Sequence, residues 1–245
     1  MPFQDFSTKA AFDAAYSFGA EGDTGHPNTR DEVRVHYHRA ILWPQARLRA
    51  TRLIATLGWV TPGPKMVIVG AGFSWLAEAL EVDHGFTHVV GVDISGYIQA
   101  EKDNTEEAEL NAEISAVGLD PASGDGLVLK GKLHDGGVRT RASKGCLNND
   151  LSTQQMRNAV KGLLELQGNT KPDVVLTESV IENLTDTEFQ TEATRLGAWA
   201  EQVVHFVVTT QEGNTPGMFN WHSLEQWFAL MPTHTFVEAS TFAVL

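Results

Sequence analysis

The stretch KMVIVGAGFSWLAEAL, residues 65–80, decides the fold because it joins a strand pattern to a helix pattern through a glycine turn. Residues 66–70 are apolar and mostly β-branched, as in a strand that is buried on both faces. A glycine turn at 70–72 breaks this run, and the residues from 74 to 82 have the character of a helix. Glycines at such a turn let the backbone approach a ligand closely, and the helix that follows presents free N–H groups to it.

Three further segments share the short, valine-rich pattern of a buried parallel strand: 88–94, 173–179 and 202–210. Helical stretches separate them, and capping-box spacings predict helix starts at Ser152, Thr185 and Ser223. Strands and helices in alternation predict an α/β fold, a Rossmann-like, doubly wound, mostly parallel sheet with helices on both faces. Ligands in such sheets bind at the carboxyl ends of the strands.

The domain organisation follows from the same pattern. We expect a Rossmann-like domain over 63–245, preceded by an N-terminal helical segment over 1–62. The aromatic residues of the N-terminal segment are interpreted as packing a helix onto the domain, with a substrate lid as the alternative. Residues 118–145 are rich in turn formers around a candidate strand at 127–133, which predicts a loop or hairpin insertion.

Composition narrows the class of protein. The chain has 42% apolar residues and no apolar run long enough to span a bilayer, and its N-terminus lacks the basic start and apolar block of a secretory signal. We therefore expect a cytoplasmic protein with no membrane partner. Cys146 is the only cysteine, which excludes an intrachain disulfide and a thiolate metal cluster. His36 and His38 have no third ligand at a recognisable spacing, so no metal is predicted.

The net charge of −13 argues against binding to nucleic acid, which needs clustered cations. Six of the ten arginines nevertheless lie between residues 30 and 52, just before the glycine turn. Such a cluster is either a solvated face or the frame of an anionic ligand.

The glycine turn does not match the dinucleotide pattern. G-x-G-x-x-G would place its third glycine at position 75, where this chain has Trp75. A G-x-G-x-G pattern needs a small residue at position 74 and finds Ser74. About twenty residues beyond the turn the second strand ends at Asp93, whose carboxylate can accept hydrogen bonds from both hydroxyls of a ribose. The glycine loop and this acidic strand end, with a third acidic site, would together form a nucleoside pocket.

Four segments together resemble the motifs of the class I S-adenosylmethionine-dependent methyltransferases, and they occur in that family's order. They are VIVGAGFS (67–74), VVGVDIS (89–95), LNNDLS (147–152) and PDVVLTESVIENLTD (172–186). The resemblance implies S-adenosyl-L-methionine as the cofactor and methyl transfer as the activity. It also implies that Gly70, Ala71 and Gly72 pass beside the methionine part of the cofactor, while Asp93 holds the ribose and Ile94 lies against the adenine.

The later motifs imply the remaining cofactor contacts. Asn149 and Asp150 would accept hydrogen bonds from the adenine amino group, and Leu151 would donate its backbone amide. Glu178 and Ser179 would border the sulfonium and the incoming acceptor. The alternatives are a helix start for Asp150 and a surface acid at a strand end for Asp93.

The chain departs from the family pattern at two places. Ser74 stands at the third glycine, where it joins the cofactor-binding set, and Asn183 stands where a histidine is frequent. The second departure leaves the catalytic residue unknown. Tyr37, His38 and Arg39 are substrate candidates, if the arginine-rich segment folds over the cofactor.

The methyl acceptor is expected to be a small molecule or a protein side chain. The chain has TESV at 177–180 instead of the Asn/Asp-Pro-Pro-Tyr motif of amino-methylating nucleic-acid enzymes, and no proline precedes Cys146 as in cytosine C5 enzymes. It ends soon after a predicted sixth strand, and we expect a homodimer partner to cover the sheet edge left there. The alternatives are an NAD(P)-dependent oxidoreductase, a methyltransferase-like binding protein without turnover, and aminopropyl transfer.

Overall fold

The computed structural model describes residues 38–72, 74–93, 107–134, 146–148, 154–178, 180–181, 184–205 and 222–232. Five parallel strands form its centre: β1 (Met66–Val69), β2 (Val89–Asp93), β3 (Cys146–Asn148), β4 (Val174–Thr177) and β5 (Gln202–His205). A π-helical turn and two helices come before β2: η2 (His38–Leu42), α3 (Trp43–Leu57) and α4 (Trp75–Val82). The later helices are α5 (Glu107–Ala116), α6 (Gly124–His134), α7 (Gln154–Leu163), α8 (Asp186–Trp199) and α9 (Leu224–Leu230).

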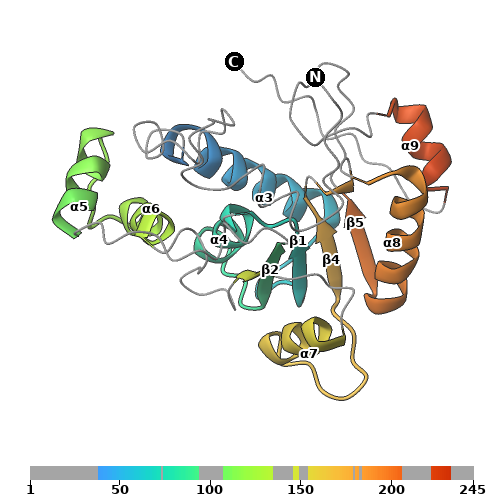
Figure 1. The fold of residues 1–245 in the computed structure, drawn as a ribbon. Helices are drawn as coiled ribbons and strands as arrows, with labels where there is room; N and C mark the ends of the chain where they lie inside the picture. Colours follow the sequence, from blue (N-terminus) through green and yellow to red (C-terminus); the bar gives the residue numbers. More distant parts are fainter. Residues whose placement is uncertain are drawn as a thin grey trace.

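The strand order is β3-β2-β1-β4-β5, with every described ladder parallel (Figure 1). The chain leaves β1 toward β2 and β3 on one side, and then crosses to β4 and β5 on the other. The order therefore reverses between β1 and β4, which makes their carboxyl ends the topological switch point of the sheet. This arrangement confirms the predicted Rossmann-like, doubly wound α/β fold.

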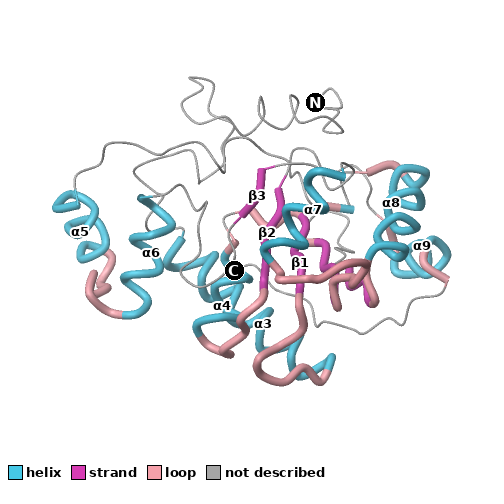
Figure 2. The backbone as a smooth tube through the Cα atoms, turned by 90° about the horizontal axis from the view of Figure 1, so that it is seen from below, coloured by secondary structure: helices cyan, strands magenta, loops and turns pink. Residues whose placement is uncertain are grey.

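Both faces of the sheet are covered, because alternate strand residues point to opposite sides. Met66 and Ile68 of β1 belong to a core cluster that contains the buried side chains of α3, α4, α5 and α6. Val67 of β1 belongs to a second cluster, with Val160 of α7 and Leu196 of α8. Figure 2 shows α5 and α6 at one end of the molecule, with α8 and α9 at the other. Within the described residues, no helix is both long and apolar enough to cross a bilayer.

Helix α3 packs directly on the sheet domain although it precedes residue 63. Its buried residues Trp43, Ala50 and Leu53 lie in the same cluster as Met66 of β1. The helix ends at Gly58, whose φ of 68° and N–H bond to the Ile54 carbonyl are those of a left-handed C-cap. Part of the predicted N-terminal segment is thus anchored on the domain.

The strand and hairpin predicted within 118–145 are wrong for residues 124–134, which form α6. Ser123 starts this helix, because its Oγ accepts from the Gly126 N–H at 3.0 Å and its carbonyl accepts from Leu127. Val128 and Leu129 bury the helix against the core cluster of α3 and α4. The run LVLKGKL fits a strand equally well in sequence, because a short apolar run does not distinguish a strand from a helix. The rest of the insertion, from 135 to 145, lies outside the described residues.

The capping boxes predicted at Thr185 and Ser223 are confirmed. Each side chain accepts from the N–H of the third helical residue, Glu188 or Gln226, whose own side chain bonds back to the cap backbone. The box predicted at Ser152 lies outside the described residues, and α7 is described from Gln154 to Leu163.

Candidate functional site

Three backbone N–H groups of the glycine turn donate hydrogen bonds to the end of β2. The Gly70 and Ala71 N–H groups donate to the Val92 carbonyl at 2.8 and 3.2 Å. The Gly72 N–H donates to Oδ2 of Asp93 at 3.0 Å. These bonds bring four predicted site residues together at the carboxyl edge of the sheet, with the largely buried Asp93 carboxylate facing the turn.

The two glycines of the turn have different surroundings. Gly70 has φ of 74°, and a Cβ there would lie 2.3 Å from Cγ2 of Val180 and 2.4 Å from the Glu178 carbonyl oxygen. Gly72 has φ of 52°, but a Cβ there would meet no described atom within 4 Å. Gly70 is therefore packed tightly against the chain that leaves β4, whereas no described residue packs against the Cα of Gly72 in this way.

Ser74 carries a buried hydroxyl at the start of α4. Ser74 is 1% exposed, and its Oγ has no hydrogen-bond partner among the described residues. Its backbone has φ of 58°, and its N–H donates to the Ala71 carbonyl at 2.7 Å, so Oγ does not cap the helix. Buried hydroxyls nearly always have a partner, which marks this oxygen as a group able to bind a ligand beside the turn.

Glu178 follows β4 on the other side of the switch point. Its N–H donates to the Val69 carbonyl at 2.9 Å, and Nη1 of Arg49 in α3 donates to its Oε1. Burial raises the pKa of Glu178 above its ordinary value of 4.5, against the opposing charge and hydrogen bond of Arg49. The backbone of Glu178 thus lies next to the glycine turn, and an arginine from α3 pairs with its largely buried carboxylate.

A second polar pair extends this edge toward β5. Oγ1 of Thr177, a buried residue, lies 2.8 Å from Nδ1 of His205, its neighbour in the strand register. The His205 ring packs against Phe189 of α8, with a centroid distance of 5.5 Å. The last residues of β4 and β5 are therefore polar, whereas the rest of β4 is apolar.

No protein-family model and no curated protein matches this chain. The structure is similar to that of a cyclopropane-fatty-acyl-phospholipid synthase-like protein from Lactobacillus casei ATCC 334, at 12% identity and a TM-score of 0.46, over 82% of this chain and 75% of that chain. It is also similar to the mitomycin 7-O-methyltransferase MmcR, at 12% identity and a TM-score of 0.42. That match covers 91% of this chain and 56% of the other, so this chain spans little more than half of its length. At this identity the likeness concerns the fold alone.

The other predicted site residues are only partly described. His38 and Arg39 lie in η2 and are partly exposed. Strand β3 ends at Asn148, the register neighbour of Asp93, one residue before the predicted adenine segment. The predictions that fall outside the described residues are those for Tyr37, Ile94, Asn149, Asp150, Leu151 and Ser179.

Sequence reasoning missed Arg49 and His205 as site residues. Arg49 belongs to the arginine cluster that precedes the turn, but the spacing of that cluster does not tell which guanidinium reaches Glu178. His205 stands at the end of a valine-rich strand, and only the register shows that it meets Thr177. Both contacts join residues far apart in the chain, 129 and 28 positions respectively.

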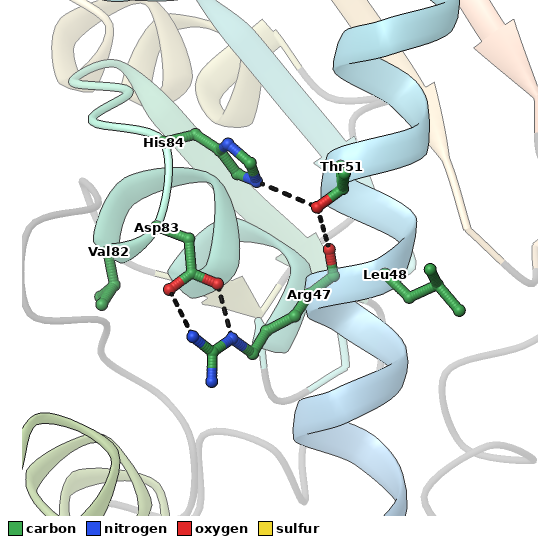
Figure 3. Close-up of a pocket in the computed structure, with 6 residues that line it drawn as sticks. All are labelled: Arg47, Leu48, Thr51, Val82, Asp83 and His84. Carbon is green, nitrogen blue, oxygen red and sulfur yellow. Dashed lines mark hydrogen bonds and ion pairs between the residues drawn. The ribbon is translucent and has the colours of Figure 1, made fainter.

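A shallow hollow of about 690 Å³ lies at the far end of α4 from the glycine turn (Figure 3). Its lining residues are Arg47, Leu48, Thr51, Val82, Asp83 and His84. Arg47 makes a two-bond ion pair with Asp83, at 2.7 and 3.1 Å, and lies 3.2 Å from Asp125 of α6. These contacts join α3, α4 and α6, which indicates a structural role for Arg47. Across the described ranges, no three metal-binding side chains lie together.

Proposed function

We propose that this protein transfers a methyl group from S-adenosyl-L-methionine to a small molecule or to a protein side chain. The observation that carries the proposal is the glycine turn at the switch point, where a Cβ on Gly72 would meet no described atom within 4 Å and the Gly72 N–H is bonded to the Asp93 carboxylate. Nucleoside ligands of doubly wound sheets bind at this place, with an acidic residue at the end of the second strand on the ribose.

The residues present fit an adenosyl ligand. Asp93 uses one carboxylate oxygen for the Gly72 N–H, and a carboxylate has further acceptor capacity for the two hydroxyls of a ribose. None of the described residues fills the space where a side chain on Gly72 would lie, and the absence of a side chain lets a ligand approach the backbone closely. The buried hydroxyl of Ser74 supplies a hydrogen-bonding group beside it. Gly70, Ala71, Gly72, Ser74 and Asp93 are therefore the proposed cofactor residues, together with the predicted Ile94, Asn149, Asp150, Leu151, Glu178 and Ser179.

A dinucleotide fits this turn less well. The third glycine of a dinucleotide motif allows the helix to pack closely on the first strand. Here that position is Trp75, a buried residue whose ring packs against Trp43 of α3 at a centroid distance of 5.5 Å. An NAD(P)-dependent oxidoreductase is therefore the second candidate.

Methyl transfer mainly requires that the acceptor atom be aligned with the methyl group of the cofactor. S-adenosylmethionine, when bound, supplies a methyl group already activated by the sulfonium. The protein then has to orient the acceptor, exclude water and match the charge of the ligand. Glu178 provides a carboxylate at this edge, and Gly70 lets the chain after β4 approach the turn.

Transfer of a labelled methyl group tests the proposal. The purified protein is incubated with S-adenosylmethionine labelled in the methyl group and with separate pools of small molecules and of proteins. We expect label in one pool, and we expect its loss in the Asp93→Asn variant. Binding of the cofactor without transfer to any pool would favour the methyltransferase-like binding protein.

A further inference from the structure

The chain that leaves β4 packs against one side of the glycine turn. The Glu178 N–H donates to the Val69 carbonyl at 2.9 Å, which keeps this chain beside β1. A Cβ on Gly70 would lie 2.4 Å from the Glu178 carbonyl oxygen and 2.3 Å from Cγ2 of Val180. Both distances are well below van der Waals contact, so the turn and the chain after β4 fit together too closely for a side chain to lie between them.

The other side of the turn is held by β2. The Gly70 and Ala71 N–H groups donate to the Val92 carbonyl, and the Gly72 N–H donates to the Asp93 carboxylate. The turn is therefore clamped between the end of β2 and the chain after β4. The position of the Gly72 amide, which the proposed ligand site uses, depends on both sides of this clamp.

Ile181 anchors the chain after β4 in a separate apolar cluster. It is 1% exposed and belongs to a cluster with Phe189 of α8 and with Trp227 and Met231 of α9. Trp227 is fully buried, and its ring lies 5.8 Å from that of Phe189 in an edge-on arrangement. Ile181 thus directly follows Val180, which touches the turn, and is itself packed among residues of α8 and α9.

We propose that Ile181 is a positioning residue for the ligand site: its packing in the cluster of Phe189 and Trp227 holds the chain after β4 against Gly70 and so fixes the glycine turn. The inference rests on the proposed function, because the ligand at the turn is the readout. The physical reason is that a closely packed contact transmits a displacement, whereas a cavity behind Ile181 would let Val180 relax away from the turn.

The test compares two substitutions that remove the same volume from buried positions. Ile181 and Leu164 are 1% and 0% exposed, and alanine at either position should lower the melting temperature. Leu164 belongs to the cluster of α7 and α8 and precedes Glu165, whose carbonyl accepts from Nζ of Lys65 just before β1. It therefore lies toward the amino edge of the sheet, at the opposite end from the glycine turn.

Binding of S-adenosylhomocysteine is measured by calorimetric titration of the full chain, at a temperature where each variant is folded. We expect the affinity to fall about tenfold in Ile181→Ala and to stay within about twofold of the wild type in Leu164→Ala. Ile181→Val should keep most of the affinity, because it removes a single methyl group from the cluster. Trp227→Phe perturbs the same cluster from α9 and should also weaken binding, and it takes the place of Ile181→Ala should that variant not fold.

The outcomes separate the two claims. If the wild type does not bind the compound, the proposed function fails and this inference fails with it. If the wild type binds and Ile181→Ala binds equally well, the inference alone is overturned. The same holds if Leu164→Ala loses as much affinity as Ile181→Ala, because the loss would then reflect stability and not the position of the turn.

Discussion

Replacing each glycine of the turn by alanine is expected to separate its two roles. Both glycines have positive φ, at 74° for Gly70 and 52° for Gly72, so each alanine costs roughly 1–2 kcal/mol in backbone conformation. At Gly70 the new Cβ would also overlap the Glu178 carbonyl oxygen at 2.4 Å, and overpacking of this kind costs about 1–3 kcal/mol more. At Gly72 the Cβ would overlap no described atom, so we expect no cost from overpacking there.

The assay is urea and thermal unfolding of the two variants beside the wild type. A change of 1 kcal/mol lowers the melting temperature of a chain of this size by about 2–4 °C. We expect a loss of about 2–5 kcal/mol in Gly70→Ala and of at most about 2 kcal/mol in Gly72→Ala. Equal losses, or a larger loss at Gly72, would refute the assignment of the close approach to Gly70. Gly72→Ala should instead weaken cofactor binding, because its methyl group enters the proposed ligand space.

Three further variants test local features. Ser74→Gly should leave the free energy of unfolding unchanged or raise it by up to about 1 kcal/mol, because glycine accepts the positive φ and the Ser74 Oγ has no described partner. A clear decrease in the free energy of unfolding in urea would contradict this. Thr185→Ala should lower the free energy of unfolding by about 1 kcal/mol, because it removes the α8 cap. Thr191→Ala, on the exposed side of the same helix, is the control and should cause no measurable change. Equal effects of the two substitutions would argue against the cap. Burial raises the pKa of Glu178 in the folded state. The contribution of Glu178 to the free energy of unfolding is therefore present below the ordinary pKa of 4.5 and is lost as pH rises through the folded-state pKa. Parallel pH profiles of urea unfolding for the wild type and Glu178→Gln would contradict this.

The fold was predictable because its strands are buried on both faces. Continuous valine-rich runs identified β1, β2, β4 and β5, and two capping boxes marked the starts of α8 and α9. The prediction failed at α6, where only the bond between Ser123 and Gly126 and the packing of Val128 on the core distinguish helix from strand. Packing of this kind is a tertiary property that a seven-residue pattern does not contain.

The candidate site was predictable where a motif places its residues on neighbouring strands. The glycine turn and Asp93 come together because parallel strands in this order align their carboxyl ends. Two features were not predictable in their present roles: the contact of Arg49, and the hydroxyl of Ser74, which has no hydrogen-bond partner among the described residues. The first depends on where α3 crosses the domain, and the second on a backbone φ that serine rarely adopts.

The most direct test of the proposed cofactor site is calorimetric titration with S-adenosylmethionine, S-adenosylhomocysteine and NAD, on the wild type and on Asp93→Asn. Asparagine keeps one oxygen for the Gly72 N–H but replaces the second acceptor by a donor, so the turn should remain while the ribose contact is lost. The proposed cofactor site predicts micromolar binding of the first two compounds by the wild type and a loss of at least about tenfold in the variant, at an unchanged melting temperature. Absence of binding of both compounds, or tighter binding of NAD, would contradict it.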